Sequence, residues 1–120
     1  MKLQIHIKRI YEPYDSADGY RILIDRLWPR GITKAEAHLD EWNKEVAPST
    51  ALRKAFNHQA DRFEEFKVAY KKELDAHQDD VIRIMHIAED KPVTLLYGAK
   101  DPKINHAIVL LTYIKDLQRS

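Results

Sequence analysis

Two arginines follow a short run of branched apolar residues, and their chemistry is the recognition of oxyanions. Residues 22–24 form an unbroken branched apolar run, which is typical of a strand covered on both faces. Asp25 and Arg26 come directly after it, and Arg30 follows Pro29, which interrupts regular structure. Guanidinium groups bind phosphate and carboxylate groups through two parallel hydrogen bonds. The sequence therefore predicts a pocket for an anionic ligand, with Arg26 and Arg30 as ligand-binding residues.

His106 is the candidate general acid or base of such a pocket. An imidazole can take up or release a proton near neutral pH, as hydrolysis or phosphoryl chemistry requires. We expect Asp25 to be the second catalytic residue and Asn105 to complete the polar lining of the ligand site. The alternative is a His106 that is hydrogen-bonded inside the fold and takes no part in chemistry.

Arg53 and His58 are further candidates for ligand binding, because they would add a third guanidinium and a second imidazole. Their alternative is the exposed face of a short helix with a cation at its C-terminus. Arg26 and Arg30 have a similar alternative: they could pair with Asp25 at the surface, where an ion pair contributes at most about 1 kcal/mol, or cap helix carbonyl groups. Both interpretations stay open at this point.

Several classes of site are absent from the sequence. The chain has no cysteine, which excludes disulfides, thiolate metal sites and a cysteine nucleophile. The remaining histidines are scattered without the spacing of metal ligands, so we expect no metal site. Only three glycines are present, and none forms a nucleotide-binding or hydrolase motif. The sequence therefore identifies no cofactor.

The charge balance of the chain limits the kinds of partner that we expect it to bind. With 20 basic and 19 acidic side chains, the chain has no overall field that would attract nucleic acid or an anionic membrane. Acidic side chains even outnumber basic ones across residues 49–90, which argues against a nucleic-acid surface. The competing hypothesis to a ligand pocket is a non-catalytic interaction protein with a protein partner. The sequence does not set the oligomeric state.

The first ten residues alternate apolar and polar side chains, which predicts a strand and not a signal peptide. No run reaches membrane-spanning length, so we expect a cytoplasmic protein. The periodicity elsewhere predicts two buried strands at 20–25 and 93–97. It also predicts helices over 34–45, from Ser49 or Thr50 to Asn57, from Asp61 through an aromatic stripe, over 79–89, and from Asp101-Pro102 onward.

This order of elements predicts one α/β domain over residues 1–120, with helices packed around a small, mainly parallel sheet. In such sheets ligands bind beyond the carboxyl ends of the strands. We therefore expect the two buried strands to be adjacent and parallel. The guanidinium of Arg26 or Arg30 should then lie within about 10 Å of the Asn105 or His106 side chain, so that one anion bridges them.

Several short motifs are spread along the chain: Arg26-Leu27-Trp28-Pro29-Arg30-Gly31, Ala47-Pro48-Ser49, Leu52-Arg53, Phe56-Asn57-His58, Thr94-Leu95-Leu96-Tyr97 and Asn105-His106-Ala107. They resemble motifs of the YeaO-like bacterial proteins, a family of unknown function. The run around Trp28 is the most specific of them, and the resemblance covers nearly the whole chain. It implies a compact α/β cytosolic protein and supplies no activity or catalytic residue.

Overall fold

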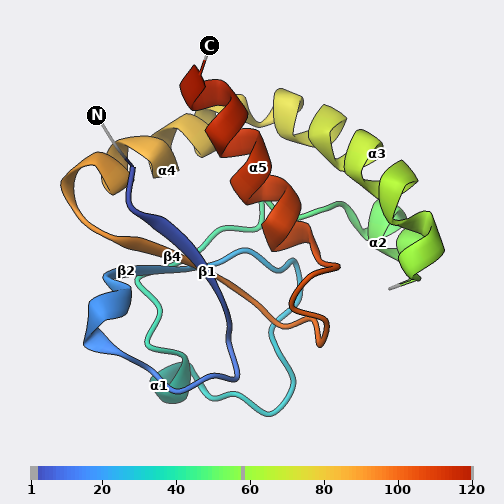
Figure 1. The fold of residues 1–120 in the computed structure, drawn as a ribbon. Helices are drawn as coiled ribbons and strands as arrows, with labels where there is room; N and C mark the ends of the chain where they lie inside the picture. Colours follow the sequence, from blue (N-terminus) through green and yellow to red (C-terminus); the bar gives the residue numbers. More distant parts are fainter. Residues whose placement is uncertain (1–2, 58, 120) are drawn as a thin grey trace.

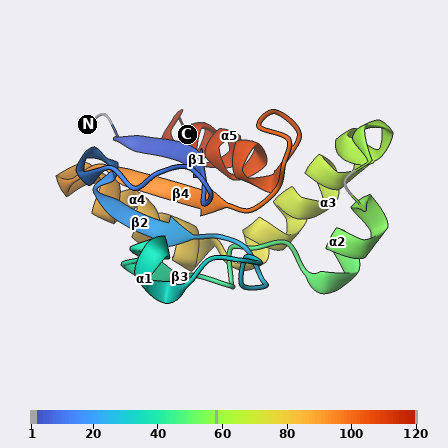
Figure 2. The same ribbon diagram turned by 90° about the horizontal axis from the view of Figure 1, so that it is seen from below.

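The computed structural model describes residues 3–57 and 59–119, and it is built around a parallel sheet. Four strands pair in the order β1-β4-β2-β3, which can be followed in Figure 2. Every pair of neighbours is parallel. The predicted α/β class with a mainly parallel sheet is confirmed. The strands are β1 (Ile5–Arg9), β2 (Tyr20–Leu23), β3 (Glu41–Trp42) and β4 (Val93–Tyr97).

The last strand in the chain lies in the interior of the sheet. Val93 of β4 is opposite Ile5 of β1 on one side and Tyr20 of β2 on the other. All five residues of β4 are buried, which explains its continuous apolar sequence. The prediction that the two apolar strands are adjacent and parallel is confirmed, although β2 ends at Leu23.

The sheet separates two apolar clusters, because successive side chains of a strand point to opposite faces. Ile22 and Leu95 belong to the larger core, which α3, α4 and α5 cover. Leu23 and Leu96 belong to a smaller cluster with Ala37 of α1. Figure 1 shows α3, α4 and α5 on one side of the sheet and α1 on the other.

The described residues form five α-helices around the sheet. The aromatic stripe predicted from Asp61 onward lies on α3, where Phe66, Tyr70 and Leu74 are buried. The helix predicted over 79–89 is also confirmed, as is the short helix capped by Ser49. The helices are α1 (Lys34–Ala37), α2 (Thr50–Phe56), α3 (Phe63–Ala76), α4 (Gln78–Asp90) and α5 (His106–Arg119), with short 3₁₀ turns η1 (Ser16–Asp18) and η2 (Ala60–Arg62).

The helix predicted over 34–45 is wrong beyond its first turn. Its capping box at Thr33 and Glu36 forms, but the helix ends at Ala37 because His38 takes a left-handed conformation with φ of 47°. The chain then runs along the open edge of β2, where Asp40 N donates to Arg21 O and Asn43 N donates to Leu23 O. Pairing with the sheet has replaced the local helical periodicity.

The last helix begins at His106 and not at Asp101-Pro102 as predicted. Asp101 Oδ1 accepts hydrogen bonds from the backbone N–H groups of Lys103 and Ile104, which closes a turn. Asn105 Oδ1 accepts from Ile108 N at 3.1 Å, the pattern of an N-cap. The positive end of the helix dipole is therefore at His106.

A buried arginine holds the chain against the smaller cluster. Arg21 is 1% exposed, and its guanidinium pairs with Asp18 and donates to the carbonyl of Ala37 at 2.9 Å. Lys8 Nζ lies 2.9 Å from the same carboxylate. Burial alone would raise the pKa of Asp18, but the hydrogen bonds from Lys8, the Asp15 backbone and Arg21 lower it below its ordinary value.

Candidate functional site

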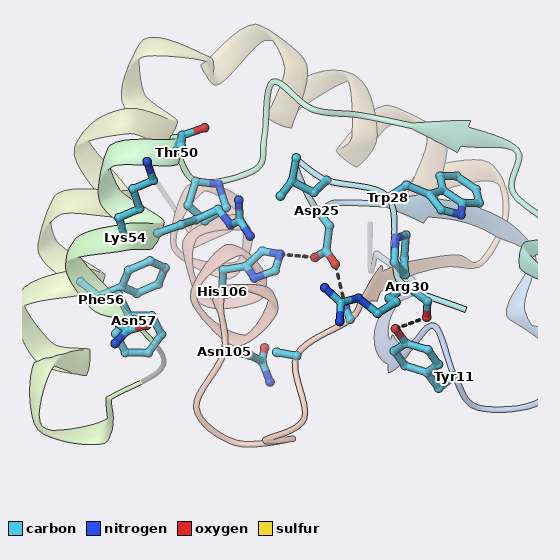
Figure 3. Close-up of a pocket in the computed structure, with 17 residues that line it drawn as sticks. Tyr11, Asp25, Trp28, Arg30, Thr50, Lys54, Phe56, Asn57, Asn105 and His106 are labelled. Atoms are coloured by element: carbon cyan, nitrogen blue, oxygen red, sulfur yellow. Dashed lines mark hydrogen bonds and ion pairs between the residues drawn. The ribbon is translucent and has the colours of Figure 1, made fainter. Parts of the chain in front are cut away.

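A cavity of about 640 Å³ opens beyond the carboxyl ends of β2 and β4. Its walls come from the loop after β2, from α2, from the turn after β4 and from the first turn of α5. Figure 3 shows Arg30 and Lys54 on opposite walls, with the side chains of Asp25 and His106 directed toward each other between them. The volume is within the range of small-molecule sites.

Asp25 is held by a backbone N–H of the turn after β4 and by a side chain of β3. Its Oδ2 accepts a hydrogen bond from Gly98 N at 2.8 Å, and its own carbonyl accepts from Trp42 Nε1 at 2.7 Å. Gly98 allows this approach because a Cβ at that position would lie 2.9 Å from Oδ2. The turn after β4 is therefore shaped around this carboxylate.

His106 faces two oxygen acceptors with one nitrogen. Its Nε2 lies 2.9 Å from the carbonyl oxygen of Ile24 and 3.0 Å from Asp25 Oδ1. The carbonyl oxygen can only accept, so Nε2 carries the proton, and a neutral ring has its lone pair on Nδ1. The hydrogen bond goes to the carbonyl, which leaves the buried Oδ1 with a polar contact but no hydrogen-bond donor. Any proton exchange by this ring would therefore use Nδ1.

Three cations line the cavity without a carboxylate partner of their own. Across the described parts of the chain, no ion pair or side-chain hydrogen bond engages the guanidinium of Arg30 or Arg53 or the ammonium of Lys54. Arg30 and Lys54 are exposed, and Arg53 is half-buried. Unpaired cations gathered around one concavity attract anions to it.

The cavity brings together most of the residues that the sequence singled out. Asp25, Arg30, Arg53, Asn105 and His106 all line it. The separation of about 10 Å between the arginines and the start of the last helix stays a prediction.

Arg26 and His58 are the two remaining candidates. The guanidinium of Arg26 donates to the carbonyl oxygens of Pro48 at 3.0 Å and Ala47 at 3.3 Å, and Arg26 does not line the cavity. His58 lies outside the described residues. Asn105, although it lines the cavity, is 1% exposed and uses its amide to donate to the Asp101 carbonyl at 2.8 Å.

Sequence reasoning missed Lys54 and Gly98. Lys54 follows Arg53 in a helix of seven residues, so the basic pair itself was the available signal. Gly98 follows a buried strand directly, a place where a glycine permits close backbone approach.

Within residues 3–57 and 59–119, no group of three potential metal-ligating His, Asp or Glu side chains comes together. The same residues contain no helix with the length and apolar character needed to cross a membrane.

Comparisons with known proteins identify a matching family and several similar proteins. A family described as "Inactive DUF488-N3 subclade" matches residues 4–120. The uncharacterized protein YeaO of Escherichia coli strain K12 is 48% identical over 115 residues, which is 96% of this chain and 100% of that protein. The uncharacterized protein Rv3073c of Mycobacterium tuberculosis strain H37Rv is 45% identical over 71 residues, 59% of this chain and 60% of its own. No solved structure matches the chain.

Proposed function

The chain belongs to the DUF488-N3i family, described as an inactive subclade, and on this premise we propose that it binds a small organic anion without converting it. The observation that carries the proposal is the set of three cations, Arg30, Arg53 and Lys54, around one cavity. Within the described residues none of their charged groups has a carboxylate partner, so a ligand can supply it. We propose that the protein binds this ligand in the cytoplasm.

The cavity also limits the kind of anion. A water molecule occupies roughly 30 Å³, so a volume of about 640 Å³ is far larger than one phosphate ion needs. Apolar side chains contribute much of the lining, among them Trp28, Pro48, Phe56 and Phe66. These features favour a phosphate or carboxylate group attached to an apolar or aromatic body.

The test compares probe molecules that differ in one property. Phenyl phosphate and benzoate carry both an anionic group and a ring, orthophosphate lacks the ring, and phenol lacks the charge. We expect the first two to raise the thermal unfolding midpoint, because a ligand at 100 times its Kd stabilises the folded state by about 2.7 kcal/mol. Titration calorimetry should then give the Kd values.

Variants decide whether the cations are responsible. Arg30→Gln and Arg53→Gln should each weaken phenyl phosphate binding by about tenfold to a hundredfold, because a hydrogen bond to a charged group contributes about 1.5–3 kcal/mol. Arg119→Gln makes the same change at the far end of α5 and should bind like the wild type. The proposal is wrong if none of the anions binds, or if all three variants behave alike.

One observation favours a second candidate, an enzyme that transfers protons. His106 and Asp25 bring an imidazole and a carboxyl group together at the cavity, as acid–base sites do, with Nε2 held by the Ile24 carbonyl and Nδ1 as the exchanging nitrogen. The family description argues against it. Turnover of p-nitrophenyl phosphate or p-nitrophenyl acetate that disappears in His106→Gln would support catalysis over binding alone. A protein partner in place of a ligand would show as complex formation that Arg30→Gln and Arg53→Gln leave unchanged.

A further inference from the structure

Residues 46–49, the segment that leads into α2, are held by side chains from two other parts of the chain. Tyr70 of α3 donates its hydroxyl proton to the carbonyl of Val46. Arg26 donates to the next two carbonyls, those of Ala47 and Pro48. Three successive carbonyl groups of this segment are therefore fixed by side-chain donors.

Ser49 is tied to α3 by a bidentate contact. Glu73 Oε1 accepts from Ser49 N at 2.8 Å, and Glu73 Oε2 accepts from Ser49 Oγ at 2.6 Å. The same hydroxyl oxygen accepts from Leu52 N at 3.2 Å, which caps α2. The carboxylate thus fixes both the backbone and the side chain of the residue that starts the helix.

The helix that follows depends on such support. α2 has seven residues, and a helix of that length has little stability of its own in water. Its apolar anchor is Phe56, whose ring stacks on Phe66 of α3 with centroids 4.5 Å apart. Arg53 and Lys54 lie between the held N-terminus and this anchor, so the position of both cations follows from these two attachments.

We propose that Arg26, Tyr70 and Glu73 are positioning residues that clamp residues 46–49 and thereby place Arg53 and Lys54 at the cavity. The proposal rests on the proposed anion binding and gives Arg26 a different role from that of a ligand-binding residue. Its planar guanidinium supplies two donors to two adjacent carbonyls, which a lysine ammonium cannot match in the same geometry.

The first measurement needs no ligand. Hydrogen exchange, resolved by segment, should rise in residues 49–57 of Glu73→Gln and of Arg26→Lys, while exchange in α4 and β4 stays as in the wild type. Glu64→Gln is the matched control, because Glu64 lies on the same helix and pairs only at the surface with Lys67, 3.0 Å away. Equal exchange of residues 49–57 in all three variants would overturn the clamp.

The second measurement uses phenyl phosphate as the probe. Both clamp variants should bind it about tenfold more weakly than Glu64→Gln, with unchanged dependence of Kd on salt concentration, because the contacting charges remain. Arg53→Gln should weaken binding and reduce the salt dependence. If Arg26→Lys binds as well as the wild type, the positioning role of Arg26 is wrong.

The two measurements separate the two proposals. Raised exchange in residues 49–57 without any binding of phenyl phosphate, benzoate or orthophosphate by the wild type would support the clamp and contradict anion binding. Binding by the wild type together with unchanged exchange in the clamp variants would support anion binding and contradict the clamp.

Discussion

At the scale of single residues, Gly98 lies directly after β4 and lines the cavity. A methyl group at this position would lie 2.9 Å from Asp25 Oδ2 and 3.9 Å from Pro29 Cβ. We predict that Gly98→Ala displaces the carboxylate, breaks its hydrogen bond from Gly98 N and lowers the free energy of unfolding by about 1–3 kcal/mol. Urea denaturation measures this loss. Asp25→Asn should remove the charge of the carboxylate with a smaller steric effect than Gly98→Ala has. If Gly98→Ala is as stable as the wild type, the close contact between Gly98 and Asp25 is not needed for stability.

Asp18 supplies a second residue-scale prediction, on pH. The pKa of Asp18 is lowered in the folded state from an ordinary value of 3.8. The charged carboxylate therefore stabilises the fold above about pH 4, and this stabilisation is lost as the pH falls through the lowered pKa. Asp18→Asn leaves the buried guanidinium of Arg21 without a carboxylate, and should lower the free energy of unfolding at pH 7 by about 3 kcal/mol.

Urea titrations of both proteins between pH 7 and pH 2.5 test the sign. The difference between wild type and Asp18→Asn should shrink below about pH 4, because a protonated Asp18 resembles the amide. A difference that stays constant over this range would mean that the charge of Asp18 is not what stabilises the fold.

The sequence singled out Arg30, Arg53 and His106, and all three line the cavity. It did not separate Arg26 from Arg30, although they lie four residues apart in one loop. Which of them reaches carbonyl groups and which borders the cavity depends on the path of residues 46–49, a distant segment. That information is tertiary and no local pattern contains it.

At the scale of elements, the entry to β2 depends on a close approach between two turns. Gly19 has φ of 69°, and a Cβ there would lie 2.2 Å from the carbonyl oxygen of Pro92, which accepts a hydrogen bond from Tyr20 N. Gly19→Ala should therefore lower the free energy of unfolding by more than about 3 kcal/mol. Gly31 is the matched control, because it has φ of 80° and a Cβ added there would meet no atom within 4 Å.

Gly31→Ala should cost only the strain of the left-handed conformation, about 1–2 kcal/mol. Urea midpoints of the two variants give the comparison directly. Equal losses at the two positions would show that the conformation of Gly19, and not its contact with Pro92, determines the cost.

Helices with long apolar periodicity were predictable from the sequence, and the elements decided by distant partners were not. The residues of the α3 stripe, which helical spacing predicts to share one face, form the buried face of that helix, so the local pattern and the tertiary structure agree. Trp42 also fitted a helical spacing with its neighbours, but the open edge of β2 offers hydrogen bonds that a helix over 34–45 would leave unmade. The start of α5 was displaced by four residues because Asp101 closes a separate turn first.

At the scale of the whole molecule, the sheet depends on a strand from the C-terminal third of the chain. β4 pairs with both β1 and β2, so a fragment of residues 1–91 lacks the partner of both strands. We predict that this fragment has no cooperative urea transition and poor amide dispersion in NMR spectra. Mixing it with a peptide of residues 92–120 should restore the transition. A fragment that folds cooperatively alone would contradict this dependence.

The same strand order has a consequence for synthesis on the ribosome. β1 and β2 leave the ribosome long before β4 exists, and at about 5–20 residues per second the wait is on the order of ten seconds. During that time the apolar residues 22–24 of the nascent chain have no strand to pair with on the side that β4 will occupy. We therefore expect the growing chain to be a client of ribosome-associated chaperones until its last third has been made.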